Sequence, residues 1–139
     1  MYYLFEHDEN PIVLTTAEEV DALIDRVRSD SPPQAPILMD VHLSEDPYAQ
    51  GLDIGVSGGH GVVRYSGRNW PRGVVSVNDG EPADGKERSY FYMGHWRGFP
   101  ANSEIPLDLV RAAVKEFMAT DGARPECICW QATSWPAGQ

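Results

Sequence analysis

The chain has 139 residues, of which 42% are hydrophobic and 23% charged, a balance ordinary for one folded soluble domain. Its net charge of −10, from 11 basic and 21 acidic residues, argues against direct nucleic-acid binding, because phosphate contacts need clustered Lys and Arg. No apolar run approaches the length of a membrane span, and Met1 to Asp8 lack the features of a signal peptide, so we expect a cytoplasmic protein without membrane contact.

The first part of the chain predicts a strand pair followed by a helix. Apolar segments at 2–5 and 12–14 flank a turn signal at Asn10-Pro11. Thr16 followed three residues later by Glu19 fits a capping box, in which each residue bonds the other's main chain. The helix is expected over 17–28, because apolar residues then recur at the spacing of one helical face: Val20, Leu23, Ile24 and Val27.

The middle of the chain predicts several short strands joined by loops. Strands are expected at 37–43, 52–56, 62–65 and 74–77, and Gly58-Gly59 indicates a tight hairpin. A strand is also expected over 89–93, with Tyr90 and Tyr92 on one face. Glycine, proline and polar residues predict loops at 69–73, 78–87 and 94–103.

The last part predicts a helix, a stop and a final strand. Pro106 suits the first helical position, and apolar residues recur at helical spacing from Leu107 to Phe117. Gly122 is expected to end this helix, and 127–130 is expected to form a buried strand. We therefore expect a single α+β domain over 1–131 with a tail over 132–139: a mostly antiparallel sheet of about six or seven strands, with two helices packed on one face.

Three short motifs resemble a known family. They are Val13-Leu14-Thr15-Thr16 before a helix, the aromatic strand Tyr90-Phe91-Tyr92-Met93-Gly94, and Gly122-Ala123-Arg124-Pro125 followed by a strand that ends at Trp130. Together they are similar to family one of the bacterial immunity proteins, which belong to polymorphic toxin systems. The resemblance implies a non-enzymatic inhibitor that binds a cognate toxin domain, often a nucleic-acid deaminase. We expect the C-terminal signature residues to be structural: Gly122, Arg124, Pro125 and Trp130.

The partner implied by this resemblance suggests which residues make contact. A nucleic-acid deaminase binds polynucleotide, so we expect a basic surface at its active site. An acidic, aromatic surface would block that site by placing carboxylates where phosphates lie, and an acidic rim would speed capture. The loops at 78–87 and 94–103 are the expected contact regions. The candidate partner-binding residues are Trp70, Asp79, Glu81, Asp84, Tyr92 and Trp96.

Two other functions fit the sequence less well. One is a small metal-assisted hydrolase that uses His95 with Cys127 and Cys129, since two cysteines two apart on a strand share a face. A structural zinc site needs a second ligand pair, which is missing, so we expect no metal or cofactor and interpret both cysteines as small buried core residues. The other is a ligand-binding module without a toxin partner.

Overall fold

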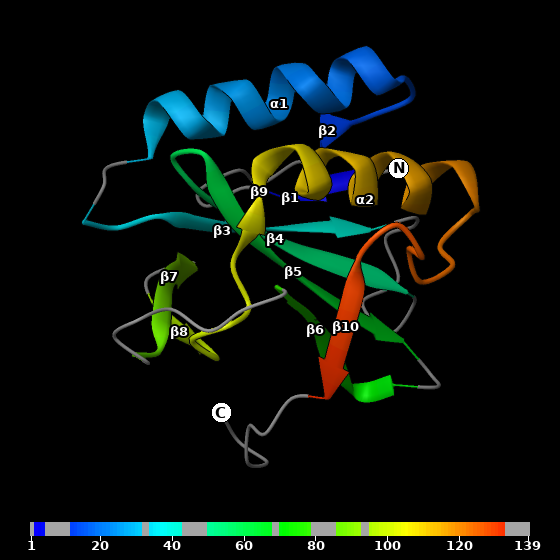
Figure 1. Cartoon of the computed structure of the whole chain (residues 1–139). Coiled ribbons are helices and arrows are strands. Elements are labelled where there is room, and N and C mark those ends of the chain that lie inside the picture. Colours follow the sequence, from blue (N-terminus) through cyan, green and yellow to red (C-terminus); the bar gives the residue numbers. More distant parts are fainter. Residues whose placement is uncertain are drawn as a thin grey trace.

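The computed structural model describes residues 2–4, 12–31, 34–42, 50–67, 70–78, 86–92 and 95–132 (Figure 1). These residues form an α+β fold, as predicted. The elements in chain order are β1 (Tyr2–Leu4), β2 (Ile12–Val13), α1 (Ala17–Asp30), β3 (Ile37–His42), β4 (Gly51–Ser57), β5 (His60–Gly67), β6 (Trp70–Val77), β7 (Arg88–Tyr92), β8 (His95–Phe99), β9 (Ile105–Pro106), α2 (Leu107–Ala119) and β10 (Cys129–Ala132).

The strands join into one curled sheet. Its principal path follows the order β10-β6-β5-β4-β3-β1-β2, and each neighbouring pair on this path is antiparallel. The antiparallel β7–β8 hairpin attaches to β3 through a parallel contact between Ile37 and Phe91, and β9 pairs with β5. The predicted mostly antiparallel pairing is therefore confirmed. The described sheet has ten strands rather than the expected six or seven, because β7, β8 and β9 join it beside the seven strands of the principal path.

The main hydrophobic core joins both helices to the central strands. Buried side chains of α1 and α2 share this core with side chains of β3, β4, β5 and β6, because each helix has one apolar stripe that must leave water. Phe117 of α2 is fully buried and meets the Tyr65 ring of β5 edge to face, with 6.3 Å between ring centres. Within the described part of the chain, neither helix is long and apolar enough to cross a membrane.

Helix α1 begins with the predicted capping box. The Thr16 hydroxyl accepts from the Glu19 main-chain N–H at 3.2 Å, and the Glu19 carboxylate accepts from the Thr16 N–H at 3.1 Å. These bonds satisfy main-chain donors that have no partner within the first helical turn. The helix ends at Asp30, two residues beyond its predicted end at 28.

Helix α2 ends where Gly122 predicted a stop. The Gly122 N–H donates to the Phe117 carbonyl at 2.9 Å, and the Asp121 N–H donates to the Met118 carbonyl at 3.4 Å. This pair of bonds is a Schellman motif, in which Asp121 takes the left-handed conformation with φ of 54°. The start differs slightly from the prediction, because Pro106 is the N-cap and the helix begins at Leu107.

Two predicted loops contain strands instead. The segment 70–73 is the start of β6, where Trp70 pairs with Gly67. The register shifts between this pair and the pair of Tyr65 with Val74, and Gly73, just before Val74, has a φ of 78°. The segment 95–99 is β8, although Gly98 and Pro100 had indicated a loop. A Cβ atom on Gly98 would collide with the Glu87 carboxylate, so this glycine makes room for a neighbouring side chain within a strand.

The final strand lies slightly later than predicted. It spans Cys129–Ala132 and pairs with β6 at one end of the principal path. Ile128, just before it, is buried, and Trp130 packs against the main core. Apart from Ala132, the predicted tail lies outside the described residues.

The capping box gives a direct test of the start of α1. We expect Thr16→Ala to lower the free energy of unfolding by about 1 kcal/mol, because the variant loses the side-chain acceptor for the Glu19 N–H. Urea denaturation of both proteins measures this difference. Ser29→Ala is the control, since Ser29 is exposed near the other end of the helix and its change should stay within about 0.5 kcal/mol. Equal effects of the two substitutions would contradict the capping role.

Candidate interaction surface

The β7–β8 hairpin brings together two of the six predicted contact residues. Tyr92 ends β7 and Trp96 lies in β8, and the hairpin closes with Tyr92 opposite His95. Trp96 therefore belongs to a paired strand rather than to the predicted contact loop. The other four candidates lie elsewhere: Trp70 begins β6, with its side chain outside the described part, and Asp79, Glu81 and Asp84 lie outside the described residues.

Tyr90 fixes the inner face of this hairpin to the sheet. Its ring is 1% exposed and meets Phe99 of β8 edge to face, with 5.6 Å between ring centres. Its hydroxyl donates to the Glu104 carboxylate at 2.6 Å, and the Arg88 guanidinium donates to the same carboxylate at 3.1 Å. Burial raises the pKa of Tyr90, and the Glu104 carboxylate raises it further, so the hydroxyl keeps its proton and remains a donor.

A second tyrosine, two residues further along β7, also attaches the hairpin to the sheet. The Tyr92 hydroxyl donates to the Asp40 carboxylate of β3, and burial is the largest of the causes that raise the pKa of Tyr92. The Arg97 guanidinium carbon lies 5.6 Å from the centre of the Tyr92 ring, within the range of a cation–π contact. Tyr92 is half-buried, so much of its ring already has partners within this domain.

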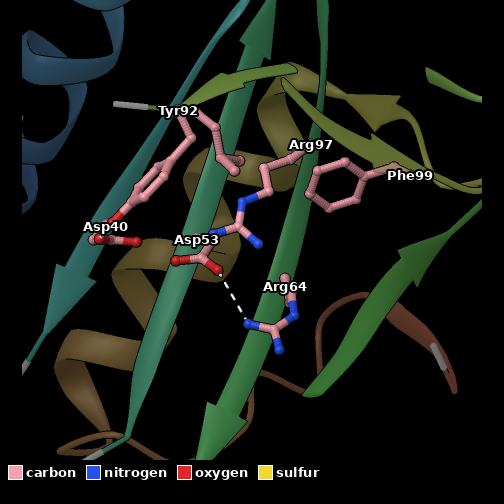
Figure 2. A pocket seen from close by; sticks show the side chains of 7 residues that line it. Asp40, Asp53, Arg64, Tyr92, Arg97 and Phe99 are labelled. Atoms are coloured by element: carbon pink, nitrogen blue, oxygen red, sulfur yellow. Dashed lines mark hydrogen bonds and ion pairs between the residues drawn. The ribbon is translucent and has the colours of Figure 1, made fainter. Parts of the chain in front are cut away.

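Beneath the hairpin lies a hollow of about 120 Å³ with charged walls, which we call the inner hollow. Asp40, Asp53 and Arg64 occupy matching positions on β3, β4 and β5, and Arg97 points in from β8 (Figure 2). An Arg64 nitrogen lies 3.2 Å from an Asp53 oxygen. Two carboxylates and two guanidinium groups thus share one partly open space between the sheet and the hairpin. The remaining lining residues are Leu38, Tyr92 and Phe99.

Asp53 has the most perturbed carboxyl group of this hollow. Burial raises its pKa well above the usual value, and the neighbouring Asp40 carboxylate raises it further. Arg64 acts in the opposite direction, because its positive charge favours the ionised form. Ionisation of the Asp53 carboxyl group is therefore unfavourable in this hollow, on the face of the sheet that the hairpin covers.

The outer face of the hairpin presents aromatic rings to solvent. Phe91 and Trp96 are cross-strand neighbours, with 5.3 Å between their ring centres. Trp96 is 55% exposed, although a tryptophan side chain is normally largely buried. Strand pairing has already ordered the main chain at Trp96, so binding there loses little main-chain entropy, which suits an interface anchor.

An open groove of about 490 Å³ lies beside Trp96. Its lining combines the exposed Trp96 with the ion pair of Arg88 and Glu104, so it offers both an apolar surface and groups of both charges; the buried Tyr90 also borders it. Such a groove suits a side chain that has an apolar stem and a polar end. The other lining residues are Gln34, Pro36, Ser57 and Ser89.

The inner hollow was not predicted, although the sequence carries a signal for it. One charged residue interrupts each of three consecutive apolar strands: Asp40, Asp53 and Arg64. A charge at the same register position of neighbouring strands indicates a polar row across a sheet. The register itself follows from the pairing of β3, β4 and β5, which is a tertiary property.

The two cysteines differ from their predicted environment. Both are exposed, so the interpretation as buried core residues is wrong; only Cys129 belongs to β10, and Cys127 precedes the strand. Partial burial and the Glu116 carboxylate raise the pKa of the Cys127 thiol to about 11, which disfavours the thiolate that a metal site needs. His95 is exposed on β8, and in the described part of the chain no three His, Cys, Asp or Glu residues are grouped to hold a metal ion.

Comparison with known protein families gives a match over most of the chain. The family described as Immunity protein Imm1 matches residues 8–132. That range covers every described element from β2 to β10, and it includes both the hairpin and the inner hollow. No curated protein matches the chain.

The inner hollow makes a prediction about pH. The pKa of Asp53 is raised in the folded state. Asp53 therefore stabilises the folded protein most when the pH is below its unfolded-state pKa of about 3.9. This contribution is lost as the pH rises through the folded-state pKa. Asp53→Asn removes the ionisation, so its stability relative to the unchanged protein should improve from about pH 4.5 to about pH 7.5. Urea denaturation of both proteins across this range measures the difference.

Asp21→Asn is the matched control, with the opposite sign. The hydrogen bond from Lys115 is the largest cause that lowers the pKa of Asp21, so its contribution is present above the unfolded value and lost as pH falls through the folded one. The loss of stability of Asp21→Asn relative to the wild-type protein should therefore be constant above about pH 5. It should become smaller only in more acidic solution. A pH-independent difference for Asp53→Asn would show that the carboxyl group is not perturbed.

Proposed function

Since the chain belongs to the Imm1 family of immunity proteins, we propose that it binds a cognate toxin domain, a nucleic-acid deaminase, and blocks its active site. The observation that carries this proposal is the family match over residues 8–132. The inhibition is steric and electrostatic, so no bond is made or broken. The sequence resemblance, which rests on separate short motifs, supports the same function.

The charge of the chain suits such a partner. A deaminase that acts on polynucleotide needs a basic surface to hold phosphates. A protein of net charge −10 is attracted to that surface from a distance and competes with the substrate for it. Three of the proposed contact acids, Asp79, Glu81 and Asp84, come shortly before β7 in the sequence, so the chain leads from them directly into the hairpin.

The hairpin supplies the proposed apolar anchor. Trp96 is 55% exposed on a strand that Tyr90 and Tyr92 fasten to the sheet, so its position is set before the partner arrives. Preorganised tryptophans carry a large share of the binding energy in many interfaces. We therefore assign Trp96 the central position of the contact surface.

Co-expression tests the proposed function directly. Cells that make the toxic domain encoded beside this gene should survive when they also make this protein. In the matching assay in solution, purified protein should stop deamination of single-stranded DNA or RNA at a one-to-one ratio with the toxin domain. Cells that die equally with and without the protein would refute the proposal, whereas protection from a toxin without deaminase activity would overturn only the assigned chemistry.

The anchor role of Trp96 predicts a loss of affinity on truncation. Trp96→Ala should weaken toxin binding by about 30-fold, which corresponds to about 2 kcal/mol. Leu109→Ala is the control, because Leu109 is 38% exposed on α2, away from the hairpin, and its truncation should leave the affinity unchanged. Isothermal titration calorimetry measures both values. Equal affinities of the two variants would remove Trp96 from the interface.

The acidic rim predicts a kinetic effect. Replacing Asp79, Glu81 and Asp84 together by lysine should slow association with the toxin and flatten its dependence on salt, because long-range attraction governs the encounter rate. Stopped-flow association rates at several salt concentrations measure both effects. Asp30→Lys reverses an exposed charge at the end of α1 and should change the rate far less per reversed charge. An unchanged salt slope in the triple variant would contradict electrostatic capture.

A further inference from the structure

The outer edge of β8 has a defined pattern of main-chain groups. On the β3 side of β7, the Phe91 N–H donates to the Pro36 carbonyl at 2.7 Å, so it points away from β8. Facing residues of an antiparallel pair either exchange both of their main-chain bonds or exchange neither. Phe91 therefore makes no ladder bond with its neighbour Trp96, and the N–H and C=O of Trp96 point to the outer edge. Gly98, two residues further on, has the same orientation.

This edge is open within the described part of the chain. There, β8 pairs with β7 alone, and no main-chain bond outside that ladder involves Trp96 or Gly98. A row of unpaired main-chain donors and acceptors is a template for another strand. Natural edge strands are usually short or carry a charge or proline at such positions, whereas this edge carries an exposed tryptophan.

Among the described strands, the other three that pair on one side only are less suited to pairing with a partner. Strands β2 and β9 have only two residues each. Strand β10 has four, and its side chains are engaged inside the domain: the Trp130 indole donates to the Pro125 carbonyl at 2.7 Å, and the Gln131 amide donates to the Ser76 carbonyl at 3.1 Å. β8 has five residues, and its exposed Trp96 has no hydrogen-bonded side-chain partner among the described residues.

We propose that the cognate toxin docks by adding one of its own strands to the outer edge of β8. This inference rests on the proposed function and specifies how the contact is made. The main-chain groups of Trp96 and Gly98 pair with the incoming strand, and the exposed Trp96 ring packs against the side chains of that strand. The tyrosine bonds to Glu104 and Asp40 hold the hairpin in place, so the edge is already extended when the partner arrives.

Amide hydrogen exchange, followed by NMR on labelled protein, tests this docking mode. In the free protein the amides of Trp96 and Gly98 should exchange rapidly. In the one-to-one complex with the toxin domain both should slow by about tenfold or more, because each amide gains a hydrogen-bond acceptor. The Arg97 amide is the internal control, since it faces β7 and is bonded in both states. The amides of β10 should also be unchanged.

Each other outcome of this experiment has a distinct meaning. A complex in which the Trp96 and Gly98 amides still exchange rapidly would overturn strand addition and leave the proposed function standing. The absence of any complex with the cognate toxin would overturn the proposed function itself. Protection of the two amides in the free protein, rising with its concentration, would show that a second copy occupies the edge, which also overturns the proposal.

A pair of substitutions at one position separates the main chain from the side chain. Trp96→Ala removes the ring and keeps the N–H, whereas Trp96→Pro removes both. The β7–β8 ladder does not use this N–H, so the proline is compatible with the hairpin, and the thermal melting of the variant checks its fold. Trp96→Pro should bind the toxin at least tenfold more weakly than Trp96→Ala. Equal binding by two folded variants would show that only the ring makes contact.

Discussion

The attachment of the β7–β8 hairpin by two tyrosine hydroxyls is the interaction on which the proposed interface depends. Tyr90 donates to Glu104 and Tyr92 donates to Asp40, so β7 is held at two points along its length. Hydrogen bonds to carboxylates are among the stronger ones in proteins, and shielding from water strengthens them further. With its inner face fixed in this way, the hairpin must turn Phe91 and Trp96 outward, because neighbouring residues of a strand point to opposite faces.

The same attachment explains why the sheet carries charges on a covered face. One core joins the helices to the sheet, and a second, smaller core forms where Tyr90 and Phe99 meet Val62 and Val75. Beside that smaller core the hairpin covers the inner hollow instead of an apolar surface. The charges of Asp40, Asp53, Arg64 and Arg97 nearly compensate one another there, which makes their shared burial tolerable.

For an inhibitor, this arrangement separates two tasks. In the proposed complex, the negative charge of the whole chain acts over distance and speeds the encounter with a basic toxin domain. In the same proposal the hairpin acts at contact, because the tyrosine bonds hold the strand that carries the exposed Trp96 ring in place before binding. A rigid anchor loses little entropy on association, so more of the contact energy remains as affinity.

Local features of the sequence determined the helices and the tight turns. The Thr16–Glu19 box, the apolar stripes, the stop at Gly122 and the hairpin at Gly58-Gly59 all concern residues close together in the chain, and the structure confirms each of them. Trp96, one of the six contact residues expected from the sequence, is exposed, although the sequence placed it in a loop rather than on a strand.

Only the tertiary structure decided which segments pair and what they cover. Gly98 indicated a loop because glycine is common in loops, yet its lack of a side chain makes room for Glu87 beside a strand. The exposure of Cys127 and Cys129 and the row formed by Asp40, Asp53 and Arg64 likewise depend on strands that are distant in sequence. Composition and spacing specify conformations within a few residues, whereas register and burial arise from contacts between segments that the sequence does not show together.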